Sequence, residues 1–381
     1  MRPFRSPLPL RCAALLLAFC AATVAWAEDA FEAPPRVVAV GDVHGDYEQL
    51  VLVLKSAGIV DEKLAWAGGR AHLVQTGDRV DRGPDSRKVM DLFIRLEKEA
   101  KKAGGMVHPL TGNHEAMNML GDLRYATPRE FAAFETPDSM LRREELWKSW
   151  RRQRMRKDET TADDVDRGRF DKEHPLGYAE HRQAFSPKGQ YGSWIVQQNA
   201  VVRIGDTLFL HGGISPKYAD LSLRAQNERV RQELQEADPD TALLVRDPEG
   251  PLWFRGLAQG DPAPLAEHIG AVLKRHGCKR MVVGHTPTEG LLVWPRYGGR
   301  VVVIDVGLSK VYGGPPAALV LEGERAFALH RGRRLPLPED DGESLLRYVR
   351  EVAALEPDPA RLSGLLARLE AGVREAAPPS R

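Results

Sequence analysis

Five short motifs occur in a fixed order in this sequence: GDVHG, GDRVDRG, GNHE, HGG and GH, between Gly41 and His285. Their carboxylate, imidazole and carboxamide side chains are typical ligands of transition-metal ions. The candidate ligands are Asp42, His44, Asp78, Asn113, His211 and His285. This set is large enough for two adjacent cations, which can activate water and hold the attacking and leaving oxygens of an in-line displacement. The motifs therefore predict a hydrolase.

The ligand types also suggest how two cations would share the site. A ligand that bridges them needs an anionic oxygen, and Asp78 is our candidate for that position. Asp42 and His44 would complete one metal site. The other would be completed by Asn113, His211 and His285. Mixed nitrogen and oxygen ligands suit Mn, Fe or Zn better than Ca, and we expect Mn, with Fe or Zn as alternatives.

Four further residues could act on a phosphate ester. His114 follows the ligand Asn113 and is placed to protonate the leaving group, a contribution worth about 10² to 10⁴ in rate. Asp81 could hold the imidazole of His114 in its donating tautomer. Arg82 and Arg255 are candidates for bidentate contacts to phosphate oxygens. Alternatively, Asp81 and Arg82 could pair with each other in a loop, and Arg255 could be structural.

Each motif follows a short apolar, β-branched run, which is typical of a strand buried on both faces. The runs are residues 36–40, 71–75, 106–110, 207–210 and 280–283, and a sixth run, 301–304, leads into Asp305. Residues 47–59 and 89–96 have the apolar spacing of helices. The 36 residues from Asp42 to Asp78 and the 35 from Asp78 to Asn113 suit two βαβ units. Such units bring successive strand-exit loops to one edge of a sheet, where α/β proteins place their active sites.

Two segments lie outside this pattern. Residues 118–192 are charged and punctuated by proline, and we expect a helical insertion there, either a cap that shapes substrate entry or a solvated surface elaboration. Residues 342–381 contain two helical patterns, so we expect a helical C-terminal appendage. The catalytic domain would then span residues 28–341. His72, His108, Arg79 and Tyr312 are interpreted as packing or rim residues.

Residues 1–27 have the pattern of a secretory signal peptide: a basic start, an apolar core and Ala25-Trp26-Ala27 before acidic residues. The apolar core of about 15 residues is shorter than the roughly 20 that a membrane span needs. We therefore expect export, to the periplasm or as a secreted protein, with no stable membrane span after cleavage. Lipid attachment at Cys20 is an open alternative.

Composition excludes some partners and chemistries. The formal net charge is +1, with 54 basic and 53 acidic residues, and aromatic residues do not alternate with basic ones, so we expect no nucleic-acid partner. After signal cleavage Cys278 is the one cysteine left, and no motif surrounds it, which argues against cysteine-based phosphatase chemistry. The oligomeric state is not indicated.

At its motifs the sequence resembles the phosphoprotein phosphatase (PPP) family of metallophosphoesterases, whose signature is GDxHG, GDxVDRG, GNHE, HGG and GH. The match covers residues 36–314 apart from the insertion. The resemblance implies an α/β protein with the calcineurin-like αββα sandwich. It implies two metal ions on the six ligands above, His114 as proton donor with Asp81 beside it, and Arg82 and Arg255 as phosphate-binding residues. Phosphate esters would be hydrolysed by direct attack of a hydroxide that bridges the metals.

Residues 253–256, 284–287 and 305–307 resemble the bacterial Shewanella-like branch, some of whose members favour phosphotyrosine. This implies a phosphomonoesterase for phosphoprotein or small phosphate esters. Where eukaryotic members have Ser-Ala-Pro-Asn-Tyr, this chain has residues 304–309 of different sequence, so their toxin sensitivity and regulatory-subunit docking do not carry over. Arg79 stands where the family usually has an apolar residue, which could alter the pocket rim.

Two alternatives stay open. One is a diadenosine polyphosphate hydrolase or other metallophosphoesterase of the same superfamily. The other is a non-catalytic phosphate-sensing protein with the same fold, against which the intact His114 and the full ligand set argue.

Overall fold

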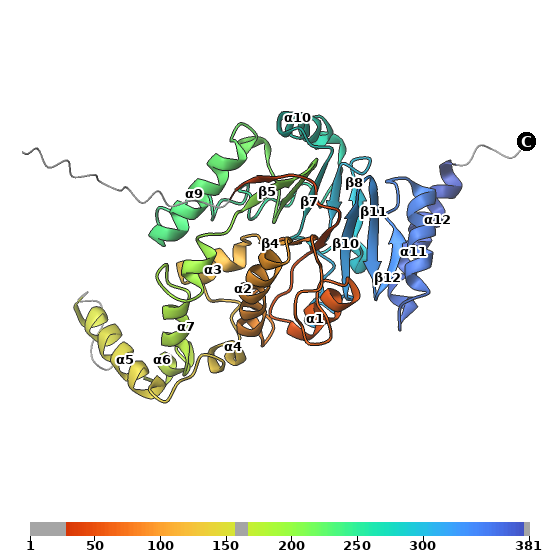
Figure 1. Cartoon of the computed structure of the whole chain (residues 1–381). Helices are drawn as coiled ribbons and strands as arrows, with labels where there is room; N and C mark the ends of the chain where they lie inside the picture. Colours follow the sequence, from red (N-terminus) through yellow and green to blue (C-terminus); the bar gives the residue numbers. More distant parts are fainter. Residues whose placement is uncertain (1–27, 157–166, 377–381) are drawn as a thin grey trace, which may run out of the picture.

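The computed structural model describes residues 28–156 and 167–376 (Figure 1). The predicted signal peptide, including Cys20, lies outside the described residues. No helix in the described part of the chain combines the length and the apolar character that crossing a membrane requires.

Two six-stranded sheets form the centre of the molecule. The first has the strand order β12-β11-β10-β2-β3-β4. Its strands are β2 (Val37–Val40), β3 (His72–Gln75), β4 (Met106–Pro109), β10 (Ala317–Glu322), β11 (Arg325–His330) and β12 (Arg333–Pro336). Strands β2, β3 and β4 are parallel neighbours, as the motif spacing predicts, and β10 to β12 extend the sheet in antiparallel fashion.

The second sheet has the order β1-β5-β6-β7-β9-β8. Its strands are β1 (Ala30–Phe31), β5 (Val201–Ile204), β6 (Thr207–Leu210), β7 (Arg280–Val283), β8 (Trp294–Arg296) and β9 (Val301–Val303). Alternate residues of these strands face opposite ways. Phe209, Val282 and Val302 join the core of the first sheet, whereas their neighbours Leu208, Leu210 and Met281 pack toward the helices on the far side.

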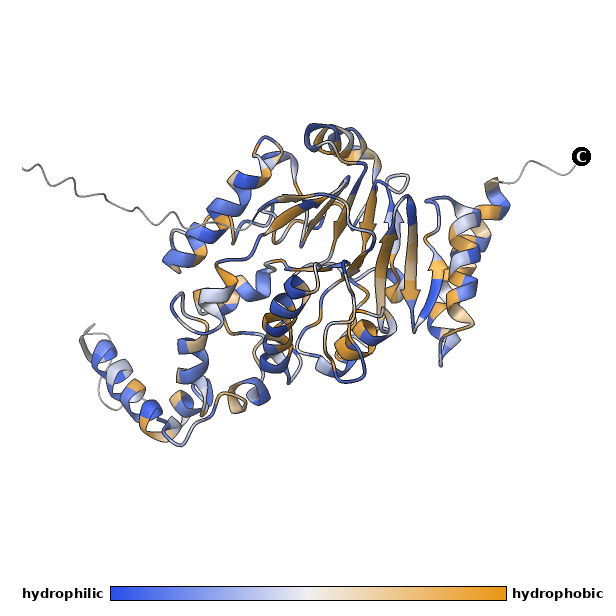
Figure 2. Ribbon diagram, viewed as in Figure 1, coloured by the Kyte–Doolittle hydropathy of each residue, from blue (hydrophilic) through white to orange (hydrophobic). Residues whose placement is uncertain are grey.

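Helices cover the outer faces of both sheets, so the predicted αββα sandwich is confirmed (Figure 1). On the first sheet lie α1 (Tyr47–Ser56) and α2 (Ser86–Lys102), and on the second α9 (Leu223–Glu236) and α10 (Ala266–His276). Figure 2 shows apolar residues concentrated on the strands and polar residues on the outer helix surfaces. Helix α1 ends earlier than the sequence predicts, because the chain turns at Gly58 with a φ of +61°.

The segment between β4 and β5 is mostly helical. It comprises α3 (Asn113–Leu120), α4 (Pro128–Ala132), α5 (Ser139–Arg156), α6 (Arg167–Glu173), α7 (Tyr178–Ala184) and α8 (Gly192–Ile195). Helices α5 to α7 form an arm that extends away from the two sheets (Figure 1). Helix α4 lies at the base of this arm, where Glu130 accepts the backbone N–H of Asp81 at 2.9 Å. At the far end of the arm, Phe170 packs against the rings of Trp147, Trp150 and His174.

After β12, helices α11 (Gly342–Ala353) and α12 (Ser363–Ala376) pack against each other beside the first sheet (Figure 1). Tyr348, Val349 and Val352 of α11 are buried in the same core as the central strands. The C-terminal helices are therefore part of the packed body.

Candidate metal centre

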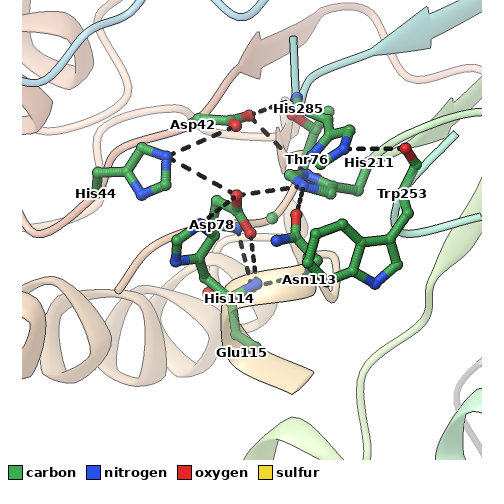
Figure 3. A network of polar contacts seen from close by, with 12 residues as sticks. Asp42, His44, Thr76, Asp78, Asn113, His114, Glu115, His211, Trp253 and His285 are labelled. Carbon is green, nitrogen blue, oxygen red and sulfur yellow. Dashed lines mark hydrogen bonds and ion pairs between the residues drawn. The ribbon is translucent and has the colours of Figure 1, made fainter. Parts of the chain in front are cut away.

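The predicted ligands meet where strand ends of the two sheets converge (Figure 3). The segments that follow β2, β3 and β4 carry Asp42 and His44, Asp78, and Asn113 at the start of α3. The segments that follow β6 and β7 carry His211 and His285. All six side chains are buried.

Close backbone packing makes this convergence possible. Gly77, directly before Asp78, has a φ of +105°, and a Cβ atom there would lie 2.6 Å from the Cα of Gly112. A Cβ atom at Gly112 would in turn collide with the carboxylate of Asp78. The two glycines therefore let the loops after β3 and β4 touch, which places Asp78 beside the first residues of α3.

Asp78 lies at the centre of the donor atoms. Its carboxylate belongs to two groups of donors that each lie within 4.8 Å of one another: one with His44 and His114, the other with His211 and His285. Asp78 Oδ2 is 3.8 Å from Nε2 of His44, 3.8 Å from Nε2 of His114 and 3.3 Å from Nε2 of His211. A carboxylate shared by two donor groups is what a bridging ligand requires.

Asp42 and Asn113 lie at the edges of these groups. Asp42 Oδ2 is 4.0 Å from His44 Nε2, and Asp42 Oδ1 is 3.9 Å from His211 Nδ1. The carboxamide oxygen of Asn113 is 2.9 Å from His211 Nε2. The structure thus brings all six predicted ligands together, and it also brings His114 close to the first group.

The second nitrogen of each predicted histidine ligand is held by a backbone carbonyl. Nδ1 of His211 bonds to Thr76 O at 2.8 Å, Nδ1 of His44 to Val80 O at 3.2 Å, and Nε2 of His285 to Trp253 O at 3.1 Å. When the outer nitrogen donates to a carbonyl, the inner nitrogen carries the lone pair. Burial lowers the pKa of His44 to about 3 and also lowers the pKa of His285, so both are in the neutral form that a metal needs.

Buried carboxylates give the site an excess of negative charge. Burial and the neighbouring Asp305 and Asp78 raise the pKa of Asp42. Burial also raises the pKa of Asp305 to about 6. Burial opposes ionisation of Asp78, but His211 and His114 lower its pKa. Cations would compensate these charges and use the converging lone pairs, so the residues present fit a two-metal centre.

His114 is held in a fixed orientation. Its Nδ1 lies 2.6 Å from Asp81 Oδ2, and Asn118 Nδ2 donates to Asp81 Oδ1 at 3.0 Å. Its Nε2 therefore faces Asp78. Burial would lower the pKa of His114, but Asp78 and Asp81 raise it. A protonated imidazole aimed into the site can act as a general acid.

The two predicted arginines are also near the centre. The guanidinium of Arg82 lies between the rings of Tyr125 and Tyr312, 4.4 Å and 5.4 Å from their centroids. The alternative that Arg82 pairs with Asp81 is wrong, because the Asp81 carboxylate binds His114 and Asn118. Arg255 Nη1 donates to His285 O at 2.7 Å, which holds this exposed side chain beside a predicted ligand.

Glu115 was not among the predicted site residues, although its carboxylate holds the backbone of the two loops that carry Asp78 and Asn113. It accepts the backbone N–H groups of Asp78 at 2.9 Å, Arg79 at 2.7 Å and Gly112 at 2.8 Å. Glu115 is the third residue of α3, and its carboxylate accepts the N–H of the N-cap residue Gly112. A Glu three residues after the residue that begins a helix is the signal that could have found it.

Of the two interpretations of Arg79, a packing residue or a residue of the pocket rim, the structure supports packing. It is completely buried, with Nη1 donating to Gln75 Oε1 and to Leu110 O, each at 2.8 Å. Its Nε lies 3.5 Å from Glu115, and its guanidinium packs over Trp194. The side chain points into the interior because it is the counter-ion of Glu115.

Other candidate residues lie elsewhere. His72 and His108 contact each other at 3.1 Å on β3 and β4, and their pKa values are lowered by burial. Burial raises the pKa of the Cys278 thiol to about 11, which does not suit a nucleophile. Tyr312, in contrast, belongs to the site, since its ring is 5.5 Å from that of His44.

A cavity of about 510 Å³ adjoins the centre. Its lining includes Met117, Tyr125 and Trp253. The ring of Tyr125 is 5.0 Å from that of His114, and the ring of Trp253 is 5.8 Å from that of His285. Two residues of its lining thus lie beside the proton donor and a predicted ligand, so the rest of a substrate could lie in this cavity.

Comparison with known proteins supports this description. Residues 35–289 match the family model of calcineurin-like phosphoesterases. A protein of Schizosaccharomyces pombe is 34% identical over 75% of this chain and 77% of its own length, and Shewanella-like protein phosphatase 2 of Arabidopsis thaliana is 29% identical over 74% and 73%.

Among solved structures, the cold-active protein-tyrosine phosphatase of a psychrophilic Shewanella species is similar, with a TM-score of 0.64, 28% identity, and coverage of 82% of this chain and 83% of that one. The predicted resemblance is thereby confirmed. The chain belongs to the calcineurin-like phosphoesterase family and is a metal-dependent phosphoesterase with Shewanella-like protein phosphatases among its relatives.

Proposed function

We propose that this protein is a phosphomonoesterase that acts on phosphoproteins or small phosphate esters. The observation that carries the proposal is His114, held by Asp81 with its free nitrogen directed at the shared ligand Asp78. The phosphorus of a monoester carries three non-bridging oxygens that share its negative charge. Arg82 and Arg255 offer two guanidinium groups that can bind them.

Each residue would have one task. Bound cations would supply Lewis acidity toward the phosphoryl group and toward water. Arg82 and Arg255 would hold the non-bridging oxygens of the phosphate and align it with the centre. His114 would pass its proton from Nε2 to the leaving oxygen, while Asp81 stabilises the charged imidazole and Asn118 keeps Asp81 in place.

For the metal, we propose manganese, with iron or zinc as alternatives. A donor set with three imidazoles, two carboxylates and one carboxamide suits these ions better than calcium. Titration of the metal-free protein with each ion, followed by elemental analysis and assay, distinguishes them. Equal activity with calcium would argue against the assignment.

For the substrate, we propose a preference for aryl over alkyl phosphates. One solved relative is named a protein-tyrosine phosphatase. In this chain, Tyr125 and Trp253 line the cavity beside the centre, and aromatic walls favour a flat aromatic leaving group.

For location, we propose export to the periplasm or beyond, on the basis of the signal-peptide pattern of residues 1–27. Expression of the full chain followed by N-terminal sequencing of the mature protein tests this. We expect a new N-terminus at Glu28, and an intact N-terminus in the cytosol would contradict it.

The activity is tested with purified protein, Mn²⁺ and four substrates: p-nitrophenyl phosphate, phosphoserine peptide, bis-p-nitrophenyl phosphate and a diadenosine polyphosphate. We expect hydrolysis of the monoesters, with the aryl ester fastest. Preference for the diester or the dinucleotide would refute the monoesterase proposal. Metal binding without turnover of any substrate would support a phosphate sensor instead.

A further inference from the structure

The cavity beside the metal centre is lined both by apolar or aromatic side chains and by charged ones. Near the centre its walls are apolar or aromatic, formed by Met117, Tyr125 and Trp253. Val245 and Pro239 continue this apolar wall from the loop that follows α9. At about 510 Å³, the cavity is larger than one aromatic ring needs, since roughly 150 Å³ is enough to hold benzene. A phosphorylated aromatic side chain would therefore leave room for a neighbouring group.

Two arginines line the same cavity, and their charges differ in how they are compensated. Arg124 forms two hydrogen bonds with Asp122, Nε to Oδ1 at 2.8 Å and Nη2 to Oδ2 at 2.6 Å. Its charge is therefore paired within the cavity wall. Arg246 donates from Nη1 to the backbone oxygen of Pro239 at 2.5 Å, which anchors the side chain without neutralising it.

Arg246 has no carboxylate partner among residues 28–156 and 167–376. The acid next to it in sequence, Asp247, instead binds Lys217 and the hydroxyl of Tyr218. Arg246 is exposed, so a ligand in the cavity can reach it. The cavity thus combines an uncompensated guanidinium with an apolar and aromatic wall.

We propose that Arg246 makes this cavity a specificity site for phosphopeptides with an acidic residue beside the phosphorylated aromatic residue. The aromatic ring would contact Tyr125 and Trp253, and the neighbouring carboxylate would bind the guanidinium of Arg246. This inference rests on the proposed aryl phosphomonoesterase activity and adds the sequence context of its substrate.

The test uses phosphotyrosine peptides with a single Glu, Gln or Lys placed in turn at each of the three positions before and after the phosphotyrosine. We expect the best Glu peptide to exceed its Gln counterpart by about two- to fivefold in kcat/KM, as a solvent-accessible ion pair allows, and the Lys peptide to be slowest. The advantage should decrease at high salt, because the charges are screened.

Arg246→Gln should abolish the preference for Glu and leave hydrolysis of p-nitrophenyl phosphate unchanged. Arg333→Gln, an exposed change on β12 remote from the cavity, is the matched control and should retain the preference. Equal rates with Glu, Gln and Lys peptides, or a preference that survives in Arg246→Gln, would overturn the inference. Absence of p-nitrophenyl phosphate hydrolysis in the unaltered protein would instead refute the proposed function, so the two failures are distinguishable.

Discussion

Five residues of the centre adopt backbone conformations that side chains normally avoid. These five residues of the centre, with φ between +46° and +69°, are His44, Asp78, Asp81, Arg82 and His285. Each such position costs on the order of 1 kcal/mol or more and persists only where surrounding contacts enforce it. Glu115, with its three backbone hydrogen bonds, is one of those contacts. The contacts of the folded chain therefore hold the backbone of the centre in this geometry.

The buried ion pair of Arg79 and Glu115 should be essential for stability. Arg79→Met leaves the Glu115 carboxylate buried without its cation, which costs about 3 to 5 kcal/mol. We expect this loss in denaturant unfolding of the metal-free protein. The control is Arg95→Met, which removes the surface partner of Glu99 and should cost less than about 1 kcal/mol. Similar losses for the two variants would contradict the role of Arg79.

His114 should matter for proton transfer more than for metal binding. His114→Asn should lower kcat by about 10² to 10⁴ while the metal content stays that of the unaltered protein. The loss should be larger for phenyl phosphate than for p-nitrophenyl phosphate, whose leaving group needs less help from an acid. Loss of metal together with activity would mean that His114 is a ligand, as its proximity to His44 and Asp78 permits.

At the scale of elements, the sequence predicts the parts of the fold that carry motifs. The regular spacing from Asp42 to Asn113 predicts the parallel strands β2, β3 and β4, and the apolar runs predict β6, β7 and β9. The antiparallel strands β10 to β12 were not predicted, because no motif follows them. Tight turns at Gly323 and Gly332 pair β10 with β11 and β11 with β12, whereas the pairing of β10 with β2 joins segments distant in sequence.

The residues of the site likewise divide into those that the motifs predict and those that they do not. Ligands within motifs are predictable because strand ends bring them together. Tyr125 and Tyr312, which enclose Arg82, come from unrelated loops, so only the folded chain reveals their contact. For Arg79 the sequence leaves packing and the pocket rim open, because sequence alone does not tell whether a charged side chain finds a buried partner.

A variant in the helical arm can show whether the insertion is a cap over the site or a surface elaboration. Phe170 of α6 is fully buried against Trp147 and Trp150 of α5. Phe170→Ala should therefore lower the stability of the arm by about 3 kcal/mol or more. Because the arm extends away from the sheets, we expect faster hydrogen exchange in α5 and α6 and unchanged kcat/KM for p-nitrophenyl phosphate (Figure 1). A parallel fall in kcat/KM would identify the arm as a cap.

At the scale of the whole molecule, a buried charge network holds the C-terminal helices to the first sheet. Glu356, in the connection between α11 and α12, binds His330 at 2.5 Å, Arg331 at 3.0 Å and Arg361 at 2.7 Å. Burial would raise the pKa of Glu356, but these partners lower it to about 2. The C-terminal helices are thus connected to β11 through an ionised carboxylate.

This network makes stability depend on pH. The pKa of Glu356 is lower in the folded chain than its ordinary value of 4.5, so its contribution is complete above pH 4.5 and disappears as the pH falls toward 2. Glu356→Gln should cost about 2 kcal/mol at pH 7 and progressively less below pH 4.5. Glu370→Gln, which removes an exposed partner of Arg350, should have little effect at either pH. A cost for Glu356→Gln that is constant with pH would contradict this linkage.

All the proposed roles depend on two cations held at the shared carboxylate of Asp78, and elemental analysis measures these cations. Protein purified without chelator, or stripped and reloaded with Mn²⁺, should contain about two metal ions per chain. Asp78→Asn should lose most of both, whereas Arg333→Gln should keep them. A chain that takes up no metal under any loading condition, or an Asp78→Asn variant with unchanged metal content, would contradict the account.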